Sequence, residues 1–167
     1  MKKLAMKNLK KTGGFTLIEI LVVIGIIAVL AAIVIVAINP AKQFAQARNT
    51  QRTSNVQSIL NAVGQRMADN RGVFAGTFTI GTQYYCPTLV TGPTTILTST
   101  DATPAAGELG CLVPTYISSL PLDPATGTGT DTGYTIAVDG VGRITVCAPA
   151  AASETSLPSP APICITR

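Results

Sequence analysis

The sequence predicts an α+β fold in which a long N-terminal α-helix, membrane-spanning and then amphipathic, packs on a small antiparallel β-sheet. An uninterrupted apolar run extends from Ile20 to Ile38, which is typical of a helix that crosses a membrane. Apolar residues then recur at helical spacing, and two alternating strands follow late in the chain, between Tyr134 and Cys147. An amphipathic helix followed by an antiparallel hairpin favours layered packing of helix on sheet.

Residues 1–14 have the composition of a basic leader. Five lysines precede Gly13 and Gly14, and these small residues lie before the apolar run, whereas a secretory signal has its cleavage site after that run. A cut here would keep segment 15–38, which is about 36 Å long as a helix and can cross a bilayer core of roughly 30 Å. The lysines indicate a cytoplasmic leader, so everything after Pro40 is expected outside the membrane.

Glu19 is the one charged residue within the predicted span. A carboxylate at the centre of a membrane helix costs about 2.5 to 3.5 kcal/mol on insertion scales, and less toward the interface, so Glu19 needs a partner. A cut after Gly14 would create an α-amine at Phe15, one helical turn earlier. Glu19 then pairs with its own amine or reaches the headgroups, or, as we favour, it pairs with the amine of a neighbouring chain and sets the register of a helix bundle.

The lysine-rich leader, Gly13-Gly14, the run Phe15-Thr16-Leu17-Ile18-Glu19 and the long apolar helix together resemble the type IV pilins and the related pseudopilins of type II secretion. The resemblance is close over residues 14–38. It implies cleavage between Gly14 and Phe15 by a prepilin peptidase, N-methylation of Phe15, and a role for Glu19 in assembly. It also implies a filament whose core is a bundle of these helices, built from copies of the chain by an inner-membrane assembly machinery.

Many members of that family have a proline inside the apolar run, whereas the first proline here is Pro40. Gly25 and the Asn39-Pro40 junction are therefore the candidate positions at which the helix loosens during assembly. Beyond this junction, residues 41–71 are expected to continue as an amphipathic helix that stops at Asp69-Asn70-Arg71-Gly72. Its predicted apolar stripe consists of Val56, Ile59, Leu60, Val63 and Met67, with Arg52, Asn55 and Arg66 off the stripe.

Residues 72–167 are expected to form a small globular head. Its four cysteines, Cys86, Cys111, Cys147 and Cys164, all lie on the predicted external side, where disulfides persist. A zinc site is disfavoured because the chain has no histidine and no C-x-x-C pair. Four cysteines allow three pairings. Cys86 with Cys111 and Cys147 with Cys164 would give two sequential bridges, and the resemblance favours a bridge near the C-terminus, but the pairing stays open at this point.

The clearest strands of the head are residues 134–138 and 141–147, which we expect to be joined by a two-residue type I′ turn at Asp139-Gly140. Their apolar face would consist of Tyr134, Ile136, Val138, Ile144 and Val146. A third strand is expected from Phe74–Ile80 or from Ile163–Arg167. The Thr/Gly/Pro-rich segment from Thr88 to Thr130, interrupted by Leu112 to Leu122, favours turns over regular structure.

Charge and motifs exclude several functional classes. The whole chain carries +4, but without the leader it has seven basic and eight acidic residues. The mildly acidic head therefore disfavours nucleic acid as a partner. A basic strip on the helix is interpreted as a solvated or subunit-facing side; it consists of Lys42, Arg48, Arg52, Arg66 and Arg71. No arrangement of catalytic acid, base or nucleophile is recognisable, so we expect a non-enzyme without a cofactor. Calcium at Asp123, Asp131 and Asp139 is considered and disfavoured, because their spacing lacks an EF-hand pattern.

The sequence therefore favours the precursor of a major type IV pilin, with residues 1–14 as a cleaved leader, 15–71 as the long helix and 72–167 as the head. The expected location is the cytoplasmic membrane before assembly and a surface filament afterwards, serving adhesion or motility. Two alternatives remain: a type II secretion pseudopilin, and a minor tip subunit that binds a ligand or DNA.

Overall fold

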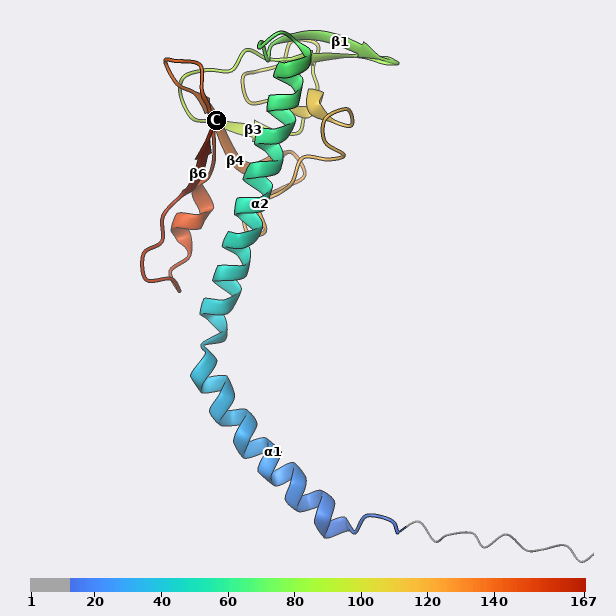
Figure 1. Cartoon of the computed structure of the whole chain (residues 1–167), viewed down its shortest axis with the longest axis vertical. Helices are drawn as coiled ribbons and strands as arrows, with labels where there is room; N and C mark the ends of the chain where they lie inside the picture. The colour runs from blue at the N-terminus through green and yellow to red at the C-terminus, as the bar shows by residue number, and fades with distance from the viewer. Residues whose placement is uncertain (1–12) are drawn as a thin grey trace, which may run out of the picture. The chain divides into compact units, whose positions relative to one another are not determined.

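The structure is a computed structural model that describes residues 13–167, so the first twelve residues of the predicted leader lie outside the described residues. The chain divides into two compact units, one ending at Pro40 and the other running from Ala41 to Arg167 (Figure 1). The first unit contains helix α1, and the second contains helix α2 and the strands. The predicted α+β class, with an apolar N-terminal helix followed by antiparallel strands, is confirmed.

Helix α1 extends over Leu17–Ile38. It passes through Gly25 without a break and ends at Asn39, whose backbone is left-handed with φ 48°. Pro40 then begins α2, where its missing N–H has no cost because the first N–H groups of a helix have no partner within the helix. The helix is interrupted at the Asn39-Pro40 junction and not at Gly25; which of the two loosens during assembly stays a prediction.

Helix α2 extends over Pro40–Asp69 and buries one face. The predicted stripe is at the centre of that face: Val56, Ile59, Leu60 and Val63 are buried and Met67 packs against them. The helix stops where the sequence predicts, because Arg71 and Gly72 both have positive φ and the Gly72 N–H donates a hydrogen bond to the Met67 carbonyl at 2.8 Å. The amphipathic part of the prediction is thus correct for its apolar residues.

Two arginines of α2 lie on the buried face, and the prediction that they lie off the stripe is wrong. Arg52 is 0% exposed and Arg66 is 3% exposed. Arg52 precedes Val56 by four residues and Arg66 follows Val63 by three, so the helical period itself aligns both with the stripe. The predicted basic strip is therefore divided, since Lys42 and Arg71 are exposed, Arg48 is half-buried, and Arg52 and Arg66 are buried.

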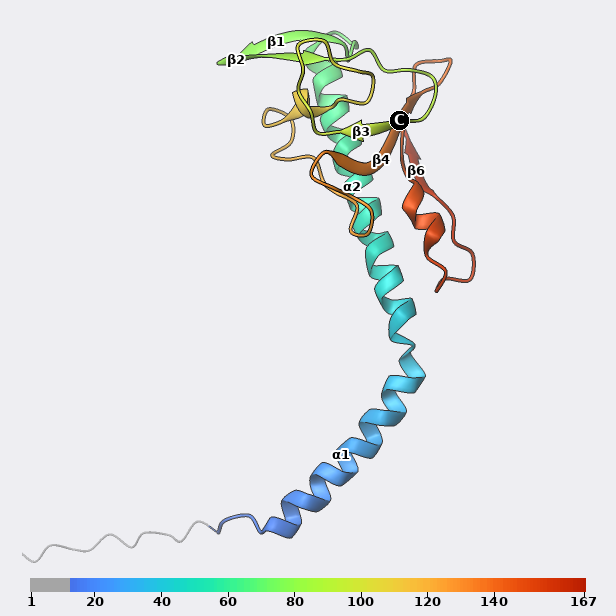
Figure 2. The same ribbon diagram turned by 180° about the vertical axis from the view of Figure 1, so that it is seen from behind.

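A four-stranded antiparallel sheet packs on α2, in the order β3-β4-β5-β6 (Figure 2). Its core residues include the predicted face of the hairpin, with Tyr134, Ile136, Ile144 and Val146 buried and Val138 packed against them. The strands are β3 (Thr94–Leu97), β4 (Asp131–Val138), β5 (Ile144–Ala148) and β6 (Ile163–Thr166).

Both segments proposed for a third strand are extended, but they join different sheets. Strand β6 lies beside β5, whereas β1 (Gly76–Ile80) pairs with β2 (Thr82–Cys86) in a separate two-stranded ribbon. The segment Thr88 to Thr130 is more regular than predicted, because it contains β3 and the 3₁₀ helix η1 (Gly110–Leu112). A second 3₁₀ helix, η2 (Pro149–Ser153), follows β5. Strand β3 is short and threonine-rich. Its sequence has no clear alternation of apolar and polar residues, and its pairing with β4 makes it a strand.

The β4–β5 connection differs from the predicted two-residue turn at Asp139-Gly140, which is wrong. The loop runs from Asp139 to Arg143. The Asp139 carboxylate accepts hydrogen bonds from the backbone N–H groups of Val141 at 3.0 Å and Arg143 at 2.8 Å. Gly142 has φ 86°, a left-handed conformation that favours glycine. The turn signal is thus the Asp139 side chain together with Gly142, not the Asp-Gly pair alone.

The register of β4 and β5 explains why the longer loop is needed. Val138 pairs with Ile144, and Ile136 pairs with Val146. Residues that pair directly share one face of the sheet, and a shift by one residue turns a strand over. A two-residue turn would pair Val138 with Val141 and turn Ile144 and Val146 away from the core, so core burial determines the loop length.

Two disulfides join segments of the second unit. Cys86 at the end of β2 is bonded to Cys111 in η1, and Cys147 in β5 is bonded to Cys164 in β6. Of the three pairings that four cysteines allow, the structure has the two sequential bridges, and all four cysteines are used. The first bridge attaches the β1–β2 ribbon to the core, and the second fastens the C-terminal strand to its neighbour.

Candidate functional site

The predicted cleavage site lies in an exposed, non-helical segment. Gly13, Gly14, Phe15 and Thr16 precede α1 without regular structure, and Phe15 is 85% exposed. A peptidase requires extended and accessible backbone, which this segment provides next to the start of the helix. A Cβ added at Gly14 would have nothing within 4 Å, so this fold places no steric demand for glycine there.

Thr16 and Glu19 form a capping box at the start of α1. The Glu19 Oε2 accepts hydrogen bonds from the Thr16 backbone N–H and from the Thr16 hydroxyl, both at 2.9 Å, while the Thr16 Oγ1 accepts one from the Glu19 N–H at 3.3 Å. Two backbone donors at the helix start are thereby satisfied. The sequence interpretation missed this contact, although Thr16-Leu17-Ile18-Glu19 has the S/T-x-x-E signature that predicts it.

The capping box uses only one oxygen of the Glu19 carboxylate. Both Thr16 bonds end on Oε2, and among the described residues Oε1 accepts no hydrogen bond. An ionised carboxylate has about four acceptor positions. Glu19 can therefore hold Thr16 and still accept a cation from outside the chain.

Helix α1 has no buried residue. Its large apolar side chains are between 50% and 84% exposed around the whole circumference, and the helix is long and apolar enough to cross a membrane, with a mean hydropathy of 3.5. A helix that is apolar on all sides is stable where lipid or other apolar helices surround it. Burial of this helix thus requires partners outside its own unit.

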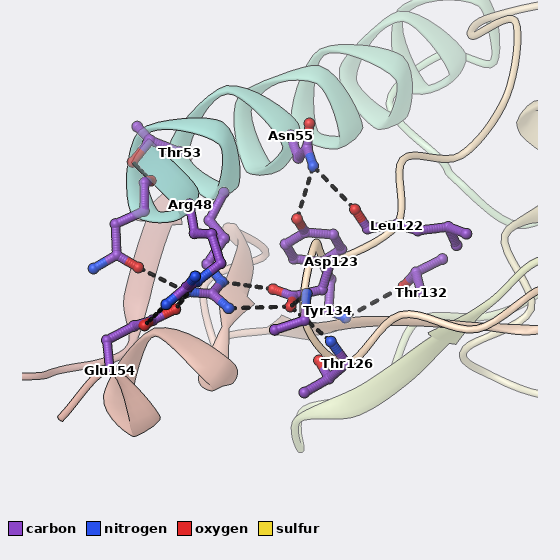
Figure 3. Close-up of polar contacts among 12 residues, drawn as sticks. Arg48, Thr53, Asn55, Leu122, Asp123, Thr126, Thr132, Tyr134 and Glu154 are labelled. Carbon is purple, nitrogen blue, oxygen red and sulfur yellow. Dashed lines mark hydrogen bonds and ion pairs between the residues drawn. The ribbon is translucent and has the colours of Figure 1, made fainter. Parts of the chain in front are cut away.

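The second unit contains a buried ion-pair cluster, drawn in Figure 3. Its centre is Arg52, whose Nε and Nη2 donate to the two oxygens of Asp123 at 2.7 and 3.1 Å, and whose Nη1 donates to Glu154 at 2.6 Å. Arg48 donates to both oxygens of Glu154, from Nε at 2.8 Å and from Nη2 at 2.5 Å. The side chains of Arg52 and Asp123 are fully buried. These contacts join α2 to the loop before β4 and to the end of η2.

Neighbouring polar groups complete this cluster. Asp123 also accepts hydrogen bonds from the backbone N–H groups of Ala125 and Thr126, and Asn55 donates to the Tyr134 hydroxyl at 2.8 Å (Figure 3). A buried ion pair is weak evidence for stability by itself, but losing one partner leaves a buried charge uncompensated. The arrangement is structural, since each of its carboxylate oxygens already faces a guanidinium.

The acid groups of this cluster have lowered pKa values. Burial by itself would raise the pKa of Asp123, but hydrogen bonds from Arg52, Ala125 and Thr126 outweigh burial and lower it. Hydrogen bonds from Arg48 and Arg52 lower the pKa of Glu154 to about 2. Burial raises the pKa of the Tyr134 hydroxyl. Both carboxylates are therefore ionised at neutral pH.

The three aspartates considered for calcium have separate roles. Asp123 pairs with Arg52, Asp139 pairs with Arg143 at 2.6 Å, and Asp131 accepts a hydrogen bond from the Gly133 N–H. Across residues 13–167, no group of three or more His, Cys, Asp or Glu side chains is placed to hold a metal ion.

Comparison with known families supports the N-terminal assignment. Residues 9–35 match the family described as the prokaryotic N-terminal methylation motif, the signature of type IV pilins and pseudopilins. The match covers Gly14, Phe15 and Glu19 and ends within α1. Comparison with curated proteins and with solved structures returned no match. The head is thus described by its own structure alone.

Proposed function

Because this chain carries the N-terminal methylation signature of type IV pilins and pseudopilins, we propose that it is the structural subunit of a type IV pilus. A prepilin peptidase cleaves between Gly14 and Phe15 and the new amine of Phe15 is methylated. The mature chain begins with the apolar helix and is anchored by it in the cytoplasmic membrane. The role is structural rather than enzymatic.

The observation that carries this proposal is the exposure of α1 on all sides. Among the described residues, none of its apolar side chains is buried, and the predicted cut leaves the helix on the product. Lipid surrounds such a helix before assembly, and equivalent helices surround it in a filament. Burial of apolar side chains contributes about 25 cal/mol per Å² removed from water, so exposing this helix to water would be costly. The helix therefore passes from lipid directly to contact with other helices.

Glu19 provides the polar contact of that exchange. Its Oε2 stays with Thr16, while Oε1 is available for the amine of a neighbour's Phe15. A charge pair in the low dielectric of a helix bundle is stronger than the same pair in water. The carboxylate therefore favours one axial register between neighbouring subunits.

The proposal includes the partners and locations of the chain. The inner-membrane pilus assembly machinery moves mature subunits from the membrane into the filament, and the head then lies at the cell surface, where the filament serves adhesion or motility. The N-terminal signature equally fits a type II secretion pseudopilin, whose filament is part of a secretion apparatus. Abundant filaments sheared from the cell surface would favour the pilus.

The test compares wild-type protein with Glu19→Gln. This variant keeps the size and most hydrogen-bonding capacity of the side chain but lacks its charge, so cleavage, membrane insertion and head folding should be unchanged. The cleaved protein should accumulate in the membrane and surface filaments should be lost. If Glu19 only pairs within its own chain, the variant will give wild-type filament yield, and the intersubunit role would be rejected.

A further inference from the structure

The β1–β2 ribbon has two open edges. β1 (Gly76–Ile80) and β2 (Thr82–Cys86) pair only with each other among the described strands. The tip, formed by Ile80, Gly81 and Thr82, is exposed, and Figures 1 and 2 show it extending beyond the rest of the second unit. Exposed strand edges present unpaired N–H and C=O groups to which another strand can pair.

The edges of the four-stranded sheet are protected, in contrast to the ribbon. The edge of β3 is covered by the following loop, since the Leu97 N–H donates to the Gly107 carbonyl at 2.8 Å and the Leu109 N–H donates to the Leu97 carbonyl at 3.0 Å. The edge strand β6 is short, follows three prolines within five residues and is followed by Arg167. Coverage, short length, proline and charge are the usual protections of an edge.

Among the described residues, the ribbon has neither a loop hydrogen-bonded along its edges nor a charged residue in its strands. The sequence from Gly72 to Thr100 contains no Asp, Glu, Lys or Arg, and no proline lies within β1 or β2. Its exposed positions are instead β-branched or uncharged: Thr77, Thr79, Ile80, Thr82 and Gln83. Uncharged segments of high β-propensity with open edges favour strand addition.

The ribbon is also held firmly at its base. The Cys86–Cys111 bridge attaches β2 to the core, and the Phe78 ring stacks on Tyr84 with 5.2 Å between centroids. The guanidinium of buried Arg66 lies 4.6 Å from the centre of the Phe78 ring, and its Nε has no hydrogen-bond partner among the described residues. A cation over a ring contributes more when it is desolvated. The ribbon is thus a pre-organised surface, which lowers the entropy cost of pairing.

We propose that the open edges of the β1–β2 ribbon pair with the ribbon of a neighbouring copy, so that heads are joined by strand addition as well as through α1. This inference rests on the proposed filament function. An uncharged edge fits an uncharged partner edge, and a neighbouring copy presents that edge in equal number. Edge pairing satisfies backbone groups that would otherwise need water.

The polarity of a filament determines which edges meet. All copies point in the same direction, so a β1 edge cannot face another β1 edge across a two-fold axis. The β2 edge of one copy instead meets the β1 edge of the next copy. Because β1 and β2 are antiparallel within the ribbon, this contact is also antiparallel, with neighbouring strands about 4.8 Å apart.

Mixed filaments test this edge assignment. One chain carries Thr79→Cys on β1 and a second carries Gln83→Cys on β2; both positions are exposed and lie on the same face of the ribbon. Cells that express both chains should give filaments in which a short bismaleimide links Thr79→Cys chains to Gln83→Cys chains. Filaments of either variant alone should give less of this product, because equivalent positions on successive copies lie two strands, about 9.6 Å, apart. Mixed filaments that form normally but show no such product would overturn the inference and leave the proposed function intact.

A charge at the edge provides the second test. Thr79→Lys adds the charged side chain that protects an edge strand from pairing, so the filament fraction should fall about fivefold. Thr79→Val keeps an uncharged β-branched side chain and should retain the wild-type filament fraction, as should Ser156→Lys, which adds the same charge at an exposed position outside the ribbon. Equal filament fractions for Thr79→Lys and Ser156→Lys would contradict ribbon pairing, whereas absence of filaments from the unmodified chain would reject the proposed function itself.

Discussion

Helices α1 and α2 differ in whether the chain itself buries their side chains. In α1 every side chain is exposed within its unit, and its one carboxylate is held by Thr16 in the first turn. In α2 the central face is buried, and the buried Arg52 finds Asp123 and Glu154, which are 71 and 102 residues further along the chain. Helix α2 is therefore packed within its own fold, whereas α1 is exposed, and we propose that lipid or other copies of the chain surround it.

The difference shows that hydrophobic pattern alone does not tell which partner a helix has. The uniform apolarity of α1 is compatible with a membrane or a helix bundle, and the mixed pattern of α2 is compatible with packing on a sheet. Charged residues add the missing information, because a buried charge must have a partner at a defined place. Glu19 and Arg52 are thus the residues at which the two helices can be tested separately.

Processing should show the largest effect and should concern α1 alone. Replacing Gly14 with leucine should leave the leader uncut and abolish filaments, because the peptidase must accommodate the residue before the cut. The head should fold as in wild type, since a Cβ at this position has nothing within 4 Å. Mass spectrometry of the membrane fraction measures the cleavage. Gly13→Ala, one residue earlier, is the matched control, and a normally cleaved Gly14→Leu chain would refute the assigned site.

Removal of Arg52 should be the most destabilising single change in α2. Arg52→Met retains an unbranched apolar side chain but leaves Asp123 buried without its cation, which costs about 3 to 5 kcal/mol. Arg48→Met should cost about 1 kcal/mol or less, because its side chain is 37% exposed and Glu154 keeps Arg52. Denaturant unfolding of the full chain in detergent, followed by near-UV circular dichroism, compares the two variants. Equal destabilisation would show that burial does not distinguish them.

The disulfides should contribute somewhat less than Arg52, and only to the second unit. Replacing Cys147 and Cys164 with serine removes a closure of 17 residues and should reduce the free energy of unfolding by about 3 kcal/mol. Non-reducing peptide mapping of the wild-type protein identifies the bonded pairs beforehand. Free thiols at all four cysteines, or a Cys86–Cys147 peptide, would contradict the pairing.

The smallest expected effect is the acid dependence of α2 packing. The pKa of Glu154 is about 2 in the folded protein and near its ordinary value of 4.5 when unfolded, so the unfolded chain binds more protons between these values. The ionised Glu154, held by Arg48 and Arg52, contributes its full share of the free energy of unfolding above about pH 4.5, and this share is lost as the pH falls toward 2. The melting temperature should fall over that range and fall less in Arg52→Met. Identical pH profiles would indicate that the cluster is not linked to folding.

The sequence predicted the features that depend on local pattern. The apolar span, the stop at Gly72 and the face containing Tyr134, Ile136 and Val146 follow from helical and strand periods. The capping box was equally readable in Thr16-Leu17-Ile18-Glu19, and the burial of Arg52 was readable in its spacing from Val56. The capping box is a signal of two residues three apart, and the burial of Arg52 follows from its four-residue spacing from the stripe.

Features that depend on distant partners were not predictable in this way. The identity of the acids that meet Arg52 depends on loops that fold 71 and 102 residues later. Strand β3 is recognisable only by its pairing with β4. The length of the Asp139 loop depends on which register buries Ile144, a condition set by the core and not by the Asp139-Gly140 pair.

The most direct measurement of the central claim is mass spectrometry of filaments sheared from the cell surface. The account predicts that this chain is abundant in them and begins at a methylated Phe15, so that α1 is retained and exposed for assembly. Filaments whose subunits still carry Met1 and the leader would contradict the proposed processing. Mature chain that remains entirely in the membrane of cells expressing the assembly machinery would contradict the proposal that α1 is completed by other copies of itself.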